Sequence, residues 1–176
     1  VPADRASEIF DHIWEIGQAH GIGLFGVESL MVLRLEKGFL HVGVDTDGTS
    51  NPMDIGFSKI VANKKGDFVG ARSLKRAEDQ RTNRRQLIGF ELDVRGDTIL
   101  PGAHIVTGSA ADRRSEGFVT SACNSPALRK TIGLGLLEGG HERKGEMITL
   151  YDDGRIVSAR VVDACFYDPS GERMRG

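Results

Sequence analysis

Six short runs with the composition of β-strands occupy the second half of the sequence and constrain the fold more than any other feature. Turns that contain Gly, Pro or Asp separate these runs, with almost no helical pattern between them. The pair Asp153-Gly154 is a strong hairpin signal, because both central residues of a type I′ turn need positive φ. The pattern predicts a small antiparallel β-barrel. The runs span residues 86–92, 104–107, 117–123, 131–137, 147–151 and 156–167.

The first half of the sequence shows helical periodicity and Gly-rich loops instead. Apolar residues recur at helical spacing after Asp4, which we expect to cap a helix that ends at Gly21 or shortly before it. A second helix is predicted over 28–37, with Gly38 at its end. The remaining predicted elements are two strands and one charged helix, over 39–44, 58–62 and 71–79.

A polar run without apolar residues, 80–85, separates the two patterns. We interpret its arginines as a solvated linker, although a polyanionic substrate tail could also use them. The predicted fold is therefore α+β. It consists of an α+β domain over residues 1–80, a small antiparallel β-barrel domain over 85–168 and a polar tail over 169–176.

The composition is that of a globular protein. Of the 176 residues, 39% are hydrophobic and 27% are charged. A net charge of −2 gives no electrostatic footprint for nucleic acid or an anionic membrane, so neither is expected as a partner. No apolar run approaches the ~20 residues that span a bilayer. Because Val1 is not an initiator Met, we expect the chain to be an excised or processed piece.

The two cysteines, Cys123 and Cys165, lie far apart in the sequence. Neither belongs to a CxxC pair, and no His stands at metal-ligand spacing from either. The favoured interpretation is two reduced thiols within β-strands, which fits a cytoplasmic location. No metal site is predicted.

Residues 33–57 combine a helix end, an apolar run and a loop rich in Asp, Gly, Thr and Ser, and we interpret them as one wall of a site. His41 is a catalytic candidate, although a structural role is more common for a single His on a strand. Asp45 and Asp47 could bind a cation, but closure of turns onto nearby amides is favoured, because further oxygen ligands are missing. No Ser-His-Asp or Cys-His set can be assembled from these residues.

Several motifs together resemble one known family. The sequence GFVTSACNSPALRKTIGLGLLE, which begins at Gly117, resembles the C-terminal barrel of the aminomethyltransferases, the T-proteins of the glycine cleavage system. The motifs LRLEKG and KGDFVGARSL resemble stretches that precede this barrel. Within the superfamily, KGFLHVGVDTDGTSNPMDIGF and the ending FYDPSGERMRG resemble the C-terminal region of the α subunits of heterotetrameric sarcosine oxidases. The resemblance covers essentially the whole chain.

The resemblance implies that the first domain is a truncated aminomethyltransferase-like domain that binds tetrahydrofolate. It further implies that the intact enzyme oxidises sarcosine, and that this region captures the one-carbon unit as methylene-tetrahydrofolate and releases glycine. FAD, FMN and NAD are expected in the rest of the intact complex, and the other subunits of the heterotetramer are expected partners. The alternatives are the corresponding region of a sarcosine or dimethylglycine dehydrogenase, or a non-catalytic folate-binding scaffold.

Two aromatic residues are carried over by position as contacts to folate. Phe39 matches an apolar residue on the pterin side in T-proteins, and Phe57 matches the Trp of their Gly-Trp pair. An aromatic face suits a flat heterocycle, because stacking depends on area and geometry rather than on charge; a core position is the alternative for each.

The chain also departs from the family. Leu30 stands where T-proteins have an Arg, and their catalytic Asp and folate-binding Glu belong to motifs upstream of Val1. No catalytic residue is therefore assigned to this chain. We expect the chain alone neither to bind folate tightly nor to turn over.

Overall fold

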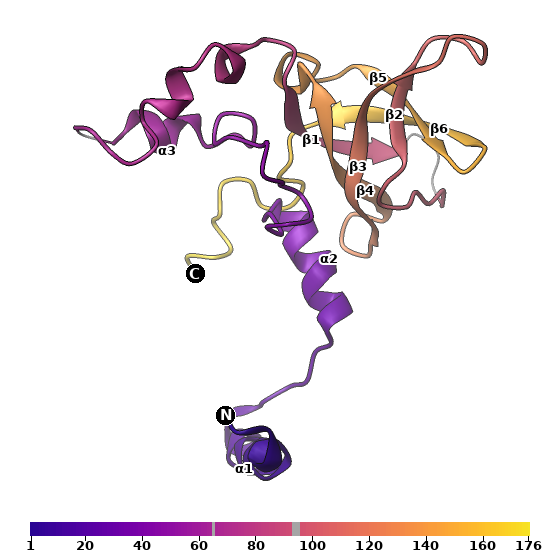
Figure 1. Cartoon of the computed structure of the whole chain (residues 1–176). Coiled ribbons are helices and arrows are strands. Elements are labelled where there is room, and N and C mark those ends of the chain that lie inside the picture. The colour runs from indigo at the N-terminus through magenta and orange to yellow at the C-terminus, as the bar shows by residue number, and fades with distance from the viewer. Residues whose placement is uncertain (65, 93–95) are drawn as a thin grey trace. The chain divides into compact units, whose positions relative to one another are not determined.

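The computed structural model describes residues 1–64, 66–92 and 96–176, which form two compact units, Val1–Leu30 and Met31–Gly176. Helices and turns dominate the chain before residue 85, and strands follow (Figure 1). No helix among the described residues is long and apolar enough to cross a membrane.

The first unit contains one α-helix with a short 3-10 turn at each end. Gly21 follows the second turn with a φ of 69°, so the predicted helix end is confirmed. The predicted cap is wrong, because Asp4 lies within the first 3-10 turn and the N-cap residue of the α-helix, Arg5, makes no side-chain cap hydrogen bond. The bounds are η1 Ala3–Arg5, α1 Ala6–Gly17 and η2 Gln18–His20.

Helix α2 spans Val27–Lys37 and ends at Gly38, as predicted. Gly38 has a φ of 74°, which favours glycine. A close approach also requires glycine here, because a Cβ would lie 2.3 Å from the carbonyl oxygen of Ala164. The end of α2 and the segment after the last strand therefore lie in contact.

Residues 39–44 do not form the predicted strand. The backbone N–H groups of Val44 and Asp45 donate to the carbonyl of His41, and the side chain of Asp45 accepts the N–H of His41 at 2.8 Å. Gly43, with a φ of 87°, allows the tight turn. These hydrogen bonds close within the turn, so they are not available to a β-ladder.

Residues 58–62 were also predicted as a strand, and they form the short helix α3 (Ser58–Ala62) instead. The carbonyl of Phe57 accepts the N–H groups of Ile60 at 3.0 Å and Val61 at 3.2 Å. This local hydrogen bonding overrides the β-propensity of the two branched residues.

The predicted helix over 71–79 is wrong as well. The segment contains two separate 3-10 turns, η3 (Ser73–Lys75) and η4 (Glu78–Gln80). Arg76 lies between them in an extended conformation, with a ψ of 148°, and an extended residue interrupts a helix.

The second half of the chain forms a closed barrel of six antiparallel strands in the order β1-β4-β3-β2-β5-β6 (Figure 1). Each predicted run contains a strand, so the predicted α+β fold with an antiparallel barrel is confirmed. Asp153 and Gly154 between β5 and β6 both have positive φ, 44° and 87°, as the hairpin signal predicted. The bounds are β1 Arg85–Leu92, β2 His104–Thr107, β3 Arg114–Ser125, β4 Lys130–Glu138, β5 Met147–Asp152 and β6 Arg155–Val162.

Strand β6 ends at Val162 and not at Tyr167, where the predicted run ended. The following segment turns to the end of α2, where the N–H groups of Phe166 and Tyr167 donate to the carbonyl of Glu36 at 3.0 and 2.8 Å. This carbonyl belongs to the last turn of the helix and needs a partner from outside it. Cys165 lies on this segment, so its predicted place within a strand is wrong.

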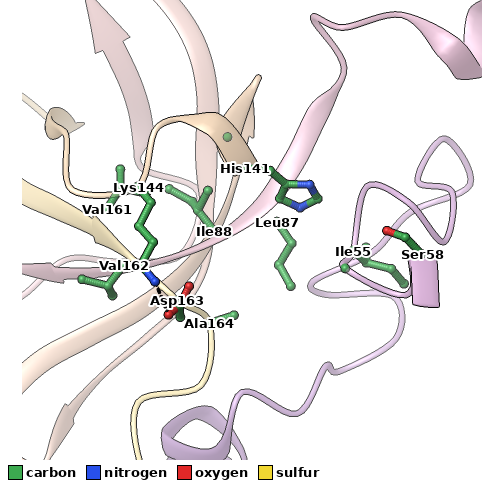
Figure 2. A pocket seen from close by; sticks show the side chains of 12 residues that line it. Ile55, Ser58, Leu87, Ile88, His141, Lys144, Val161, Val162, Asp163 and Ala164 are labelled. Carbon is green, nitrogen blue, oxygen red and sulfur yellow. Dashed lines mark hydrogen bonds and ion pairs between the residues drawn. The ribbon is translucent and has the colours of Figure 1, made fainter. Parts of the chain in front are cut away.

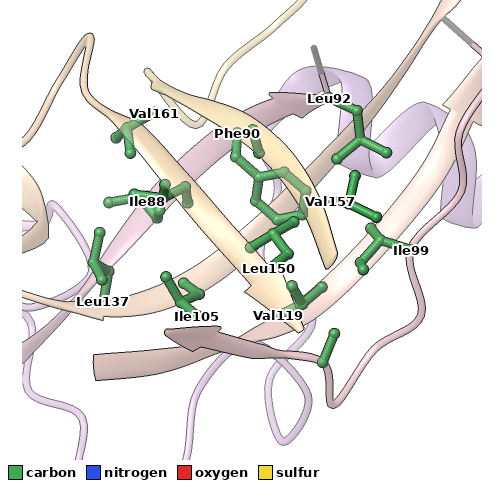
Figure 3. Packing of buried hydrophobic residues seen from close by; sticks show 13 residues of the cluster. Ile88, Phe90, Leu92, Ile99, Ile105, Val119, Leu137, Leu150, Val157 and Val161 are labelled. Carbon is green, nitrogen blue, oxygen red and sulfur yellow. The ribbon is translucent and has the colours of Figure 1, made fainter. Parts of the chain in front are cut away.

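Apolar side chains fill the interior of the barrel (Figure 3). Phe90 on β1 is fully buried among them. Gly133 on β4 leaves the space that this ring occupies, because a Cβ at Gly133 would lie 2.2 Å from the ring. The labelled members of the cluster are Ile88, Phe90, Leu92, Ile99, Ile105, Val119, Leu137, Leu150, Val157 and Val161.

Strand β4 is buried on both faces, which explains its nearly continuous apolar run. A second cluster covers the face that the barrel interior does not use. Leu35 of α2, Leu87 of β1 and Leu134 of β4 belong to this cluster, and Leu40 and Ile55 pack against it. The loop that follows α2 is therefore attached to the outside of the barrel.

Candidate functional site

A hollow of about 700 Å³ lies where the loop after α2 meets the barrel. Its volume falls in the range of about 300–1,000 Å³ that is typical of small-molecule pockets. We call it the Phe39–Phe57 hollow. Its lining residues are Gly38, Phe39, Leu40, Val42, Thr46, Asp47, Ser50, Asn51, Pro52, Ile55, Phe57, Leu87, Ala164 and Cys165.

The two aromatic residues singled out in the sequence both line this hollow. Phe39 is 54% exposed and Phe57 is 43% exposed, so neither ring lies in a core. Backbone hydrogen bonds position both residues: the N–H of Phe39 donates to the carbonyl of Arg34 at 2.8 Å, and that of Phe57 donates to the carbonyl of Pro52 at 2.7 Å. Their contact with folate stays a prediction.

A buried carboxylate holds the turn beside Phe39 in place. Asp45 has no exposed surface, and Arg34 pairs with it at 2.5 Å. The N–H of His41 donates to the same oxygen, Oδ2, at 2.8 Å. The hydroxyls of Thr120 and Ser121 donate to the other oxygen, Oδ1, at 2.5 and 2.7 Å. Burial by itself raises the pKa of Asp45, but these hydrogen bonds and the charge of Arg34 lower it overall, so the carboxylate is ionised at neutral pH.

A β-bulge in β3 allows two consecutive hydroxyl side chains to reach this carboxylate. Val119 is opposite Gly135 on β4 and Ser121 is opposite Leu134, so Thr120 is the extra residue. Successive residues of a regular strand point to opposite faces, whereas a bulge re-aims one of them. Irregularity in the barrel thus creates the binding site for Asp45.

Arg84 holds the next part of the loop. Its guanidinium forms a bidentate pair with Asp54, with Nε–Oδ1 at 3.0 Å and Nη2–Oδ2 at 2.6 Å, and it also donates to the carbonyl of Thr49 at 2.6 Å. The side chain of Arg84 is 14% exposed. The interpretation of residues 80–85 as a solvated linker is therefore wrong for Arg84, because a buried carboxylate from the loop pairs with it.

Asp47 contributes the one carboxylate among the described residues that line the hollow. The structure places no Lys, Arg or His in the same described set. Hydrogen bonds from the hydroxyl of Thr49 first, and then from backbone N–H groups, lower the pKa of Asp47. The hollow therefore combines apolar and aromatic walls with one negative charge.

A second hollow of about 340 Å³ shares Ile55, Leu87 and Ala164 with the first (Figure 2). Lys144 and Asp163 line it and form an ion pair at 2.5 Å. Both side chains are more than half exposed, so solvent screens the pair. This hollow lacks the aromatic rings of the first among its described lining residues.

Within the described part of the chain, no group of three or more His, Cys, Asp and Glu side chains could hold a metal ion. Asp45 and Asp47 instead accept backbone N–H groups of their own turns, as the turn interpretation predicted. His41 is exposed on the turn and is not among the residues that line the hollow.

Both cysteines are free thiols. Cys123 lies on β3, as predicted, and burial, followed by the nearby charge of Glu36, raises its pKa to about 11. A thiol with such a pKa is a poor nucleophile at neutral pH. Cys165 lines the Phe39–Phe57 hollow.

The barrel contributes a side of the hollow that the motifs in the sequence do not indicate. Leu87 was interpreted as an ordinary strand residue, yet it lines the hollow from β1. The consecutive apolar residues Leu87 and Ile88 were an available signal, because loss of alternation indicates burial on both faces. The adjacent hydroxyls Thr120 and Ser121 within an apolar strand were a second signal, for a buried polar partner.

Two family models match most of the chain. The model described as the GCVT N-terminal domain matches residues 1–65. The model described as the glycine cleavage T-protein C-terminal barrel domain matches residues 85–168.

Curated relatives match the whole chain. It is 38% identical to the sarcosine oxidase subunit alpha of Corynebacterium sp. (strain U-96), over 100% of this chain and 18% of that protein, in its C-terminal portion. It is 33% identical to the trimethylamine-oxide aldolase of Ruegeria pomeroyi, over 97% of this chain and 21% of that protein. The chain thus spans about a fifth of the length of these relatives.

A solved structure has the same fold. The crystal structure of the glycine cleavage system aminomethyltransferase T from Bartonella henselae matches 96% of this chain and 45% of its own, with a TM-score of 0.74 and 18% identity. At this identity the likeness concerns the fold alone.

Proposed function

The chain belongs to the glycine cleavage T-protein family, and on that premise we propose that it is the tetrahydrofolate-binding region of a polypeptide related to the sarcosine oxidase α subunits. One observation carries the proposal: Phe39 and Phe57, each assigned to folate from a separate motif, line the same hollow and expose their rings.

The hollow fits a flat heterocycle in size and chemistry. Its walls are apolar where Leu40, Ile55 and Leu87 contribute, and aromatic where Phe39 and Phe57 contribute. Apolar and aromatic walls bind a planar ring through buried area, and the few polar groups at one end can orient it.

In the proposed reaction, tetrahydrofolate supplies the amine nitrogens that take up the one-carbon unit of oxidised sarcosine, giving methylene-tetrahydrofolate and glycine. The residues of this chain bind the cofactor, orient it and exclude water. Exclusion matters because the reactive imine must meet the folate amine before water does. No residue of this chain is assigned a role in proton transfer.

The remaining components of this proposal lie outside the chain. Oxidation would take place at a flavin in another subunit, with FAD, FMN and NAD in the rest of a heterotetrameric complex in the cytoplasm.

We propose residues 1–80 as the C-terminal portion of the folate-binding domain, 85–168 as the barrel domain and 169–176 as a tail. The chain alone would bind folate weakly and would not turn over.

A second candidate function comes from another relative, since the chain is 33% identical to a trimethylamine-oxide aldolase over 97% of its length. The corresponding region of a sarcosine or dimethylglycine dehydrogenase and a non-catalytic folate-binding scaffold remain further alternatives. Assays with sarcosine, dimethylglycine and trimethylamine oxide, each with and without tetrahydrofolate, identify the substrate that is consumed, and a non-catalytic scaffold consumes none of them.

Calorimetric titration of tetrahydrofolate into the full-length protein that carries this chain tests the proposal directly. Phe57→Ala and Phe39→Ala should each weaken binding by about 1–3 kcal/mol, because truncation of an aromatic contact removes buried area. Met147→Ala is the matched control, since Met147 is 42% exposed on β5 and lines neither hollow. Absence of saturable binding to the full-length protein would refute the folate proposal.

A further inference from the structure

The charged side chain that lines the Phe39–Phe57 hollow can orient a ligand bound there. Asp47 supplies the carboxylate, and the described lining residues include no Lys, Arg or His to attract an anion. A ligand with an anionic part would therefore meet repulsion from Asp47, whereas Arg84 and Arg85 line a separate hollow of about 200 Å³ on which Asp47 also borders.

The two oxygens of Asp47 are not equivalent. Oδ1 accepts the N–H and hydroxyl of Thr49 at 2.8 and 2.7 Å, and the N–H and hydroxyl of Ser50 at 3.1 and 3.2 Å. Oδ2 has no hydrogen-bond partner among the described residues. The turn therefore fixes the carboxylate through one oxygen and leaves the other as an acceptor, on a residue that lines the Phe39–Phe57 hollow.

Two of the neighbouring polar side chains, those of Asn51 and Ser50, are already engaged in hydrogen bonds within the protein. Asn51 accepts the N–H groups of Met53 and Asp54 through Oδ1 at 2.9 and 3.0 Å. Its Nδ2 donates to Asp79 at 3.3 Å, and the hydroxyl of Ser50 donates to Asp47. A ligand that binds beside them thus meets Asp47 as its principal acceptor.

We propose that Asp47 sets the direction in which the cofactor enters: its free oxygen accepts from the N–H-bearing edge of the heterocycle, and the carboxylate-bearing tail points away from it. This inference rests on the proposed function. A reduced pterin ring carries an amino group and ring N–H groups as donors, whereas the glutamate tail of folate carries carboxylates. Attraction and repulsion at Asp47 therefore favour the same orientation.

Asp47→Asn is the informative substitution. Asn keeps an oxygen that can accept the Thr49 and Ser50 donors, so the turn is retained, and it replaces the free oxygen by an NH₂ donor without charge. The affinities of the full-length protein for tetrahydrofolate and for a tetrahydropterin without the benzoylglutamate tail should be measured by calorimetry. We expect Asp47→Asn to weaken both by a similar factor, roughly tenfold, since both ligands share the ring that Asp47 contacts.

Asp163→Asn is the matched control, because Asp163 lines the second hollow and not the first. Its two affinities should stay within about twofold of the wild type. Equal unfolding midpoints for wild type and Asp47→Asn would show that the fold is retained.

The outcomes separate the two proposals. If the wild type binds both ligands and Asp47→Asn changes neither affinity, the assignment of Asp47 is wrong and the folate proposal stands. If Asp47→Asn binds tetrahydrofolate more tightly and the tail-free pterin unchanged, the tail lies beside Asp47 and the orientation is reversed. If the wild type binds neither ligand, both proposals are wrong.

Discussion

Replacement of Asp45 by Ala should destabilise the chain by about 3–5 kcal/mol. The carboxylate has no exposed surface, and its partner Arg34 is 14% exposed. Removing one member of a buried ion pair costs about this much, because the remaining charge stays buried without a partner. The hydroxyls of Thr120 and Ser121 would lose their acceptor as well.

Urea unfolding followed by far-UV circular dichroism measures the effect. With a slope of about 2 kcal/mol per M, a loss of 4 kcal/mol lowers the unfolding midpoint by about 2 M. Asp112→Ala is the control, since Asp112 also accepts the N–H and hydroxyl of a nearby Ser109 but lies exposed in a turn. This substitution should leave the midpoint almost unchanged.

A double-mutant cycle with Arg34→Met separates the ion pair from the rest of the network. If the pair is coupled as the 2.5 Å contact implies, the double substitution Arg34→Met/Asp45→Ala should cost less than the sum of the two single ones. A loss below about 1 kcal/mol for Asp45→Ala would show that the carboxylate does not hold the turn, and strictly additive effects in the cycle would show that Arg34 and Asp45 are not coupled.

Two further predictions concern pH and packing. Burial alone raises the pKa of Asp45, but hydrogen bonds, led by that of Thr120, lower it overall. The ionised carboxylate therefore contributes its full stabilisation above the unfolded-state pKa of about 3.9, and this stabilisation is lost as the pH falls through the lower pKa of Asp45 in the folded state. Urea midpoints between pH 7 and pH 3 should therefore fall less steeply for Asp45→Asn than for the wild type. Gly133→Ala should cost about 1–3 kcal/mol in the same assay, because its Cβ would lie 2.2 Å from the ring of Phe90, whereas Gly48→Ala, with open space around it, serves as the control.

The barrel could be predicted because its signals are local. Each strand lies between turn residues, and Asp153-Gly154 adopts the positive φ values that its hairpin needs. The errors arose where a distant residue decides the local conformation. Residues 39–44 have the composition of a strand, but Asp45 closes them into a turn, and Asp45 is in turn held by hydroxyls 75 and 76 residues further along.

The site shows the same division between local and long-range information. Phe39 and Phe57 could be selected from their motifs, one residue at a time. Their presence in one hollow depends on Leu87 and Ala164, which the barrel brings to the loop, and no spacing in the sequence encodes that contact. Arg84 was misread for the same reason, because its partner Asp54 lies 30 residues earlier.

The barrel acts on the site through its outer face, and the β-bulge at Thr120 is the point of contact. Apolar packing of Leu35 against β4 attaches the loop to the barrel, but apolar contact alone tolerates small shifts. The hydrogen bonds of Asp45 do not tolerate such shifts. A shift of the loop by one residue along the strand would separate the carboxylate of Asp45 from the hydroxyls of Thr120 and Ser121. The polar contact therefore selects one register of the loop on the barrel. Since Phe39 and Asp47 flank Asp45 in the same loop and both line the hollow, that register also determines where these two residues lie along it.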